Sequence, residues 1–124
     1  MSEYHSTIYD DAFEPAAWEM EPRFLNIARL YLGDNKRLGA FKWEYEKRIG
    51  EVRYADSASG EFGEMDVQRY VAVFLMEINS LLALAGCDVS DGSAANTALV
   101  PLQCALHREA QRRYNELVKA GKAK

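Results

Sequence analysis

Two polar side chains in apolar surroundings are the first candidates for chemistry in this chain. Glu77 lies inside the run 67–85, where helical spacing places it beside apolar residues. His107 is one of only two histidines and falls beside Tyr114 in the last apolar stripe. A carboxylate and an imidazole held together can act as a general acid–base pair or as metal ligands. One hypothesis is therefore a small enzyme or metal protein centred on Glu77 and His107.

The same residues also suggest a structural role. A buried carboxylate costs free energy unless a partner group meets it. Arg113 falls on the apolar stripe of the C-terminal segment, so a buried Glu77–Arg113 ion pair would fix the packing of two helices. A bundle metal site would need a Glu-x-x-His pattern, and the order His107-Arg-Glu109 does not provide it. We therefore interpret Glu77, His107 and Arg113 as buried polar residues with a structural role.

Motifs for metals, cofactors and nucleophiles are missing. The loop Asp88–Ser93 resembles a calcium loop in composition, but the EF-hand pattern would then place Gly92 and Leu99 at ligand positions. The chain contains no Gly-rich phosphate loop, no Gly-x-Ser-x-Gly and no His-Glu-x-x-His. Cys87 and Cys104 do not form a CxxC pair and are expected to be free thiols. We predict no catalytic residue, no cofactor and no metal, and hence a protein that is not an enzyme.

The formal net charge of −4 conceals an uneven distribution along the chain. Up to Glu21 the chain contains acidic residues and neither Lys nor Arg, whereas basic residues predominate after His107. Two charged ends of opposite sign are typical of separate partner-binding surfaces, although they also solvate a surface or attract each other. The predicted partner-binding residues are Asp10, Asp11, Glu14, Glu19, Arg108, Arg112 and Lys119.

Nucleic acid is the alternative partner. Segment 36–54 interleaves basic and aromatic residues, as single-strand binding requires, but Glu44, Glu46 and Glu51 reduce its local field. The basic residues Arg108, Arg112 and Lys119 are less mixed with acidic ones, because helical spacing places all three on one side of the last helix. With a sequence pI near 5.2, nucleic acid binding is the weaker hypothesis.

The elements that position these residues are expected to be helices. Segment 66–85 has an apolar arc wider than half its circumference, which indicates a central core helix with several neighbours. Glu77, Asn79 and Ser80 interrupt it, so we predict no membrane span. Asp66 is the expected N-cap, and Gly86 the residue that ends the helix.

The remaining segments are shorter or less regular. Segment 101–119 is predicted to be an amphipathic helix that begins at Pro101. Residues 15–21 are expected to form a short turn with Trp18 packed inward, and Pro22 to begin a new helix that ends at Gly33. For segment 36–54 a helix is favoured, with a small β-hairpin at 41–54 as the alternative.

The sequence thus predicts an all-α fold: a single domain, 1–124, formed by a bundle of three to five helices, with residues 1–12 loosely ordered. The chain lacks a secretory signal, and we expect a cytoplasmic protein. We predict a non-enzymatic protein-binding module, such as an accessory protein, inhibitor or assembly factor, by analogy with small acidic proteins of phages and mobile elements. Unpartnered apolar surface on the central helix would also allow a homodimer.

Overall fold

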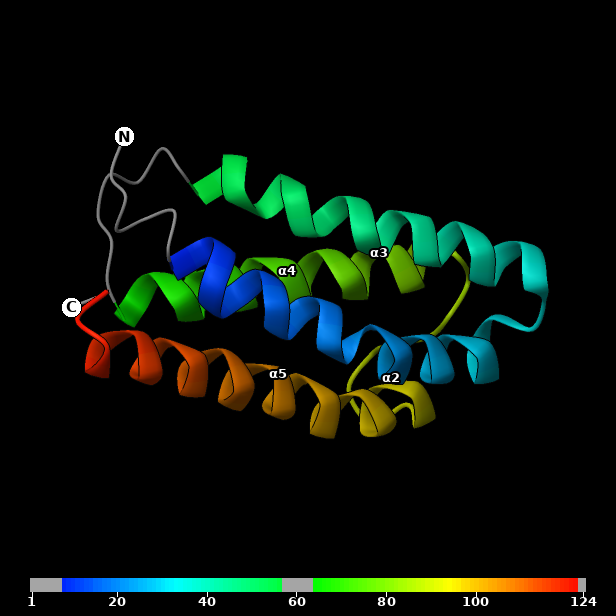
Figure 1. Ribbon diagram of the computed structural model, residues 1–124. Coiled ribbons are helices and arrows are strands. Elements are labelled where there is room, and N and C mark those ends of the chain that lie inside the picture. The colour runs from blue at the N-terminus through cyan, green and yellow to red at the C-terminus, as the bar shows by residue number, and fades with distance from the viewer. Residues whose placement is uncertain (1–7, 57–63, 123–124) are drawn as a thin grey trace.

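The protein forms an antiparallel bundle of helices (Figure 1). The computed structural model describes residues 8–56 and 64–122. In these ranges the elements are a short π-helical turn, η1, and four α-helices, α2, α3, α4 and α5. Successive long helices run in opposite directions, and α2 and α4 each lie between α3 and α5. Their bounds are Ile8–Phe13 (η1), Glu14–Leu32 (α2), Asn35–Asp56 (α3), Glu64–Leu84 (α4) and Ala94–Lys119 (α5).

The central helix, α4, supplies much of the core. Along its buried face, Tyr70, Phe74 and Ile78 are fully inaccessible to solvent. Phe74 packs edge-on against Tyr45 of α3, with ring centroids 5.0 Å apart, and against Phe13 of η1 at 5.5 Å. These contacts join three elements around one aromatic cluster. The prediction of a small all-α bundle with a central apolar helix is confirmed.

Part of α4 also has the composition of a membrane span. Among the described residues, Val67–Leu84 is the stretch long and apolar enough to cross a bilayer by length and composition. Core helices of bundles share both properties, and the buried face of this stretch packs against its neighbours.

Glycines end two of the helices as the sequence predicts. Gly33 adopts the left-handed conformation (φ 85°) after α2, and Asp34 then accepts a hydrogen bond from the Arg37 backbone N–H at 2.7 Å. Gly86 (φ 95°) follows α4, where the Cys87 N–H donates to the Leu82 carbonyl at 2.9 Å. Both are positions where residues other than glycine would be strained.

The start of α4 differs slightly from the prediction. The helix begins at Glu64, so Asp66 lies within its first turn and is not the N-cap.

Two prolines lie inside helices, contrary to the sequence prediction. Pro22 is in the middle of α2 and Pro101 is in α5, which begins at Ala94 and not at Pro101. A proline removes one backbone hydrogen bond, but both rings are exposed, and buried residues on either side keep each helix continuous. The predicted short turn at 15–21 is therefore wrong. The prediction that Trp18 packs inward is also wrong, since its side chain is 42% exposed.

Segment 36–54 is helical, so the hairpin alternative is wrong. Phe41, Tyr45 and Ile49 are buried at the four-residue spacing of a helix, whereas Trp43 is 61% exposed beneath the Lys47 ammonium group. The alternation of aromatic residues at 41–45 thus reflects one buried helical face and one exposed tryptophan.

The expectation of loose order in residues 1–12 falls partly outside the described residues, which begin at Ile8. Within η1, Ala12 and Phe13 are fully buried, and Phe13 belongs to the aromatic cluster of the core.

Candidate functional site

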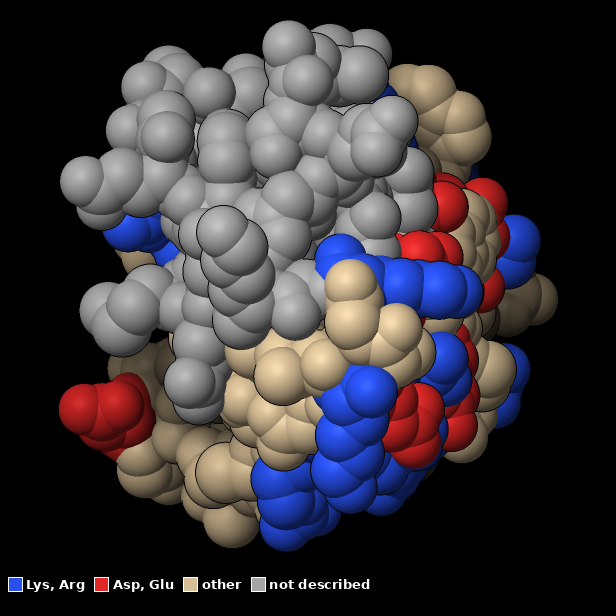
Figure 2. All heavy atoms as spheres, turned by 60° about the vertical axis from the view of Figure 1, so that its left-hand side comes forward, with Lys and Arg blue, Asp and Glu red and all other residues tan. Residues whose placement is uncertain are grey.

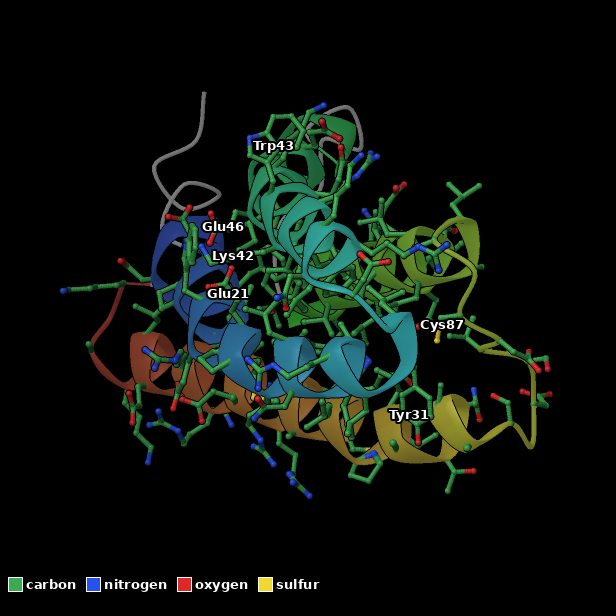
Figure 3. The ribbon with its side chains drawn as sticks, turned by 90° about the vertical axis from the view of Figure 1, so that its right-hand side faces the viewer. Glu21, Tyr31, Lys42, Trp43, Glu46 and Cys87 are labelled. Carbon is green, nitrogen blue, oxygen red and sulfur yellow. The ribbon has the colours of Figure 1, made fainter. Side chains whose placement is uncertain are left out.

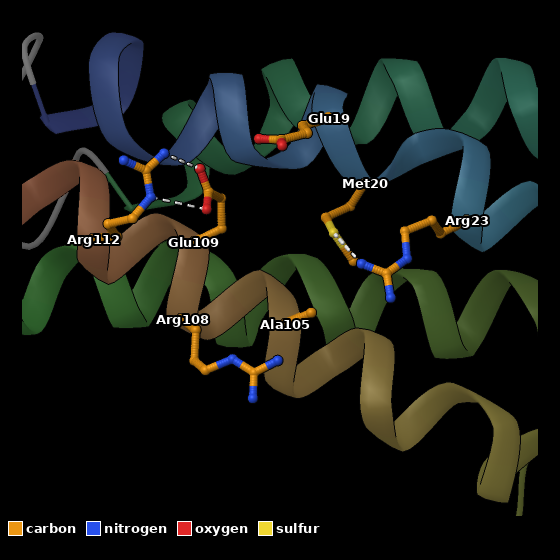
Figure 4. A pocket seen from close by; sticks show the side chains of 7 residues that line it. All are labelled: Glu19, Met20, Arg23, Ala105, Arg108, Glu109 and Arg112. Carbon is orange, nitrogen blue, oxygen red and sulfur yellow. Dashed lines mark hydrogen bonds and ion pairs between the residues drawn. The ribbon is translucent and has the colours of Figure 1, made fainter.

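A groove of about 360 Å³ lies between the antiparallel helices α2 and α5 (Figure 4). Ala105, the first α5 residue of the lining, lies at the end of the groove nearest Arg23 and carries only a methyl group, which leaves space beside it. Residues spaced by three or four positions share a helix face, which explains why these side chains converge. The groove is lined by Glu19, Met20 and Arg23 of α2 and by Ala105, Arg108, Glu109 and Arg112 of α5.

One end of the groove is closed by a network of ion pairs. Glu109 accepts hydrogen bonds from both Arg112 and Arg113. Arg112 also pairs with Glu116 at 2.6 Å, and Arg113 reaches across to Glu19 at 2.9 Å. The hydrogen bond from Arg112 lowers the pKa of Glu109, and the two neighbouring carboxylates raise the pKa of Arg112. The charges at this end are therefore largely matched within the protein.

The other two arginines of the groove are differently placed. Arg23 is exposed, and its guanidinium contacts the Met20 sulfur at 3.8 Å. Arg108 is exposed on the opposite wall. Within the described part of the chain, neither guanidinium is paired with a carboxylate. The groove thus combines unmatched cationic groups with an apolar floor formed by Met20, which is 4% exposed, and Ala105.

On one end face of the bundle, cationic and anionic side chains are interspersed. Figure 2 shows the end of the bundle at which η1 begins and α5 ends, with Lys and Arg side chains gathered at its lower right and acidic ones between them. Such mixing reduces the long-range field of any one cation.

Three of the predicted partner-binding residues, Glu19, Arg108 and Arg112, line this groove. Asp11 is exposed in η1, Glu14 begins α2, and Lys119 is exposed at the end of α5, all outside the lining. The Asp10 side chain lies outside what the structure describes.

Arg23 was not among the predicted site residues. Pro22 was expected to begin a new helix, and that break hid the relationship between Glu19 and Arg23 four positions later. In the continuous helix these two residues lie on one face, so recognising that Pro22 does not interrupt α2 would have identified Arg23.

The predicted ion pair between Glu77 and Arg113 is wrong. The Glu77 side chain is 44% exposed and pairs with Arg48 of α3 at 3.3 Å, whereas Arg113 pairs with Glu19 and Glu109. Glu77 lies at one edge of the apolar arc of α4, and that edge faces α3 and not α5.

The structure also separates Glu77 from His107. The His107 ring nitrogen Nδ1 lies 2.5 Å from Gln68 Oε1, and partial burial lowers the pKa of the imidazole. Gln68 and Glu77 are nine positions apart, which places them on opposite sides of α4 and about 13 Å apart along its axis. The two residues therefore do not form an acid–base pair.

A second polar cluster lies between α2 and α3. Figure 3 shows Glu21, Lys42 and Glu46 close together, and Lys42 donates to Glu46 at 2.9 Å. The Glu21 oxygen Oε2 is buried and receives no hydrogen bond within the described residues. Burial and the hydrogen bond with Glu46 raise the pKa of Glu21 to about 7, while that bond lowers the pKa of Glu46. A proton on Glu21 lets it donate to the Glu46 carboxylate.

A smaller groove of about 220 Å³ lies between α3 and α4, lined mainly by apolar residues such as Phe41 and Leu81. Leu84, one of the lining residues, is 85% exposed, and Met76 on the same helix is 70% exposed. Met76 and Leu84 are thus two large apolar side chains that α4 leaves exposed.

The two cysteines are free thiols, Cys87 buried and Cys104 exposed. Among the residues that the structure describes, no group of three or more His, Cys, Asp or Glu side chains is arranged to hold a metal ion.

Comparison with protein-family models, curated proteins and solved structures finds no match for this chain.

Proposed function

We propose that the protein is a non-enzymatic binding module that holds a segment of a partner protein in the groove between α2 and α5. The observation that carries the proposal is the position of Arg23 and Arg108 on opposite walls of one groove, neither of them paired with a carboxylate in the described chain. Cationic groups left without an internal partner are available to an external one.

The lining of the groove favours a protein segment over a small solute. Protein interfaces combine an apolar centre with a polar rim, and arginine is enriched in them. Met20 and Ala105 provide the apolar centre here, and the charged side chains provide the rim. Two α-helices form the walls, so the shape of the groove is set before binding, which reduces the entropic cost of association.

A module of this kind would serve as an accessory protein, an inhibitor or an assembly factor by occupying a partner's surface. We place it in the cytoplasm, where the free thiols Cys87 and Cys104 would remain reduced. A homodimer is a further proposal, supported by the exposure of Met76 and Leu84 on α4.

Binding of nucleic acid is the second candidate. Arg108, Arg112 and Lys119 are all exposed, and their spacing places them on one side of α5. Against it, Arg112 is already paired with Glu109 and Glu116. Salt separates the two candidates, because each phosphate contact contributes a slope of about 0.9 to the fall of log K with log salt concentration.

The exposed thiol of Cys104 offers a direct test. Cys104 precedes Ala105 on α5, and Cys87 is buried, so a thiol-reactive photocrosslinker would label mainly the rim of the groove. We expect irradiation in extracts of the native cell to join the labelled protein to one specific protein, with a yield that persists at high salt.

The matched control places the crosslinker elsewhere on the bundle. In a C104S/S80C variant, the label would sit on the exposed side of α4, and the same partner should not be crosslinked. Equal crosslinking from both positions, or none from Cys104, would contradict the proposal. Crosslinking to nucleic acid that disappears at high salt would favour the second candidate.

A further inference from the structure

We infer that the groove between α2 and α5 recognises an acidic side chain of its partner, held as a carboxylate between Arg23 and Arg108, with an apolar neighbour on the floor of the groove. This inference rests on the proposed function and names the chemistry of the segment that binds.

The positions of the two arginines carry the first step. Figure 4 shows the Arg23 side chain directed from α2 toward α5 and the Arg108 side chain on the side of α5 away from α2, with Ala105 between the two guanidinium groups. A guanidinium presents several N–H donors in a planar fork that matches the two oxygens of a carboxylate. Two such groups, one from each helix, can hold one anionic group over Ala105, which lies between them.

The charge balance favours a single negative charge. Arg23, Arg108, Arg112 and Arg113 contribute four positive charges in and beside the groove, and Glu19, Glu109 and Glu116 contribute three negative ones. The surplus is one positive charge, which one carboxylate neutralises. A polyanion such as a nucleic acid strand would have to pass close to the three glutamates, whose repulsion opposes it.

The floor of the groove defines the residue beside the acidic one. Met20 is nearly buried and is flexible enough to adapt to different apolar shapes, and Ala105 leaves space above α5. Burying an apolar side chain there would exclude water from the carboxylate and strengthen its hydrogen bonds to the arginines. The expected ligand is thus an acidic residue adjacent to a Leu, Ile, Met or aromatic residue.

Short random peptides displayed on phage test this inference without knowledge of the partner. The full-length protein is the bait, and selected peptides are compared with the starting library. We expect enrichment of Asp or Glu next to an apolar residue. We also expect retention of these peptides to fall at least about tenfold in R23Q/R108Q, because each guanidinium loses a charge-assisted hydrogen bond.

The matched control is R29Q/K122Q, which removes one positive charge from α2 and one from beyond the end of α5, at exposed positions outside the groove. It should retain the peptides as the wild type does. All four substituted side chains are exposed, and unchanged circular dichroism would show that the variants remain folded.

Selection of no peptide, of peptides without acidic enrichment, or of acidic peptides that bind R23Q/R108Q normally would overturn the inference. These results differ from failure of the proposed function, since crosslinking from Cys104 could still identify a protein partner whose segment is neutral. Loss of binding in R29Q/K122Q as large as that in R23Q/R108Q would also overturn it, because it would indicate attraction by overall charge.

Discussion

The Arg113 guanidinium meets the Glu19 carboxylate at 2.9 Å, although 94 positions separate them in the sequence. This ion pair links α5 to α2 at the groove. The sequence allowed two interpretations of the charged ends: separate partner-binding surfaces, or attraction between the ends. For Glu19 and Arg113 the structure shows attraction. The pair both joins the helices and limits which charges remain for a partner.

Replacing either partner of this pair should have a small effect on stability. The side chains of Arg113 and Glu19 are 27% and 55% exposed, so water screens their attraction. We expect E19Q to lower the free energy of unfolding by about 0.5 kcal/mol in urea denaturation. R113Q should cost more than E19Q, because Glu109 also loses a partner. A loss of several kcal/mol in E19Q would be inconsistent with a solvent-screened pair.

The pair Glu21 and Glu46 predicts a stability that depends on pH. The pKa of Glu21 is about 7 in the folded protein, compared with 4.5 when it is unperturbed. Between these pH values the folded state binds more protons than the unfolded state. The contribution of Glu21 to stability is therefore fully present below pH 4.5 and is lost as the pH rises through 7. The site is partly open to solvent, and we expect a loss of about 1 kcal/mol, measured by urea denaturation at pH 5 and pH 8.

E21Q isolates this effect. The amide can still donate to Glu46 but cannot ionise, so the variant should lose this part of the pH dependence and exceed the wild type in stability at pH 8. E14Q removes a carboxylate near the start of the same helix and is the matched control. Wild-type stability that rises between pH 5 and 8, and rises equally in E21Q, would refute the assignment.

The aromatic cluster of the core predicts a large effect at Phe74. This side chain is fully buried and contacts Phe13 and Tyr45, so F74A would leave a cavity between η1, α3 and α4. We expect a loss of about 3–5 kcal/mol in the free energy of unfolding. Met76, two positions later, is 70% exposed, and M76A should change stability by less than about 0.5 kcal/mol. Similar losses in the two variants would argue against the burial pattern of α4.

The sequence predicted the helices where apolar periodicity was strong. In α4 the apolar residues repeat over the whole helix, and Gly86 ends it, so both its type and its extent could be predicted to within two residues. Pro22 and Pro101 misled the prediction, because local propensity disfavours proline inside a helix while burial of residues on either side outweighs that preference.

The site was only partly predictable, because it depends on how helices are rotated against each other. Helical spacing placed Arg108 and Arg112 on one face of α5, and the groove includes both. The spacing could not show that Glu77 faces α3 and pairs with Arg48, nor that Arg113 reaches Glu19. Pairs between helices follow from tertiary packing, which one sequence does not encode in any short motif.

Occupation of the groove between α2 and α5 by a partner protein is the proposal that most needs a test. Its most direct test is the equilibrium dissociation constant for the protein that crosslinks to Cys104, measured with wild type, A105W and A105S. Tryptophan at position 105 would fill the space that Ala105 leaves, whereas serine would keep it open. We expect A105W to bind at least about a hundredfold more weakly, a loss of about 2.8 kcal/mol in binding free energy, and A105S to bind nearly as the wild type does. Equal affinity of A105W and wild type for the partner would contradict the proposal.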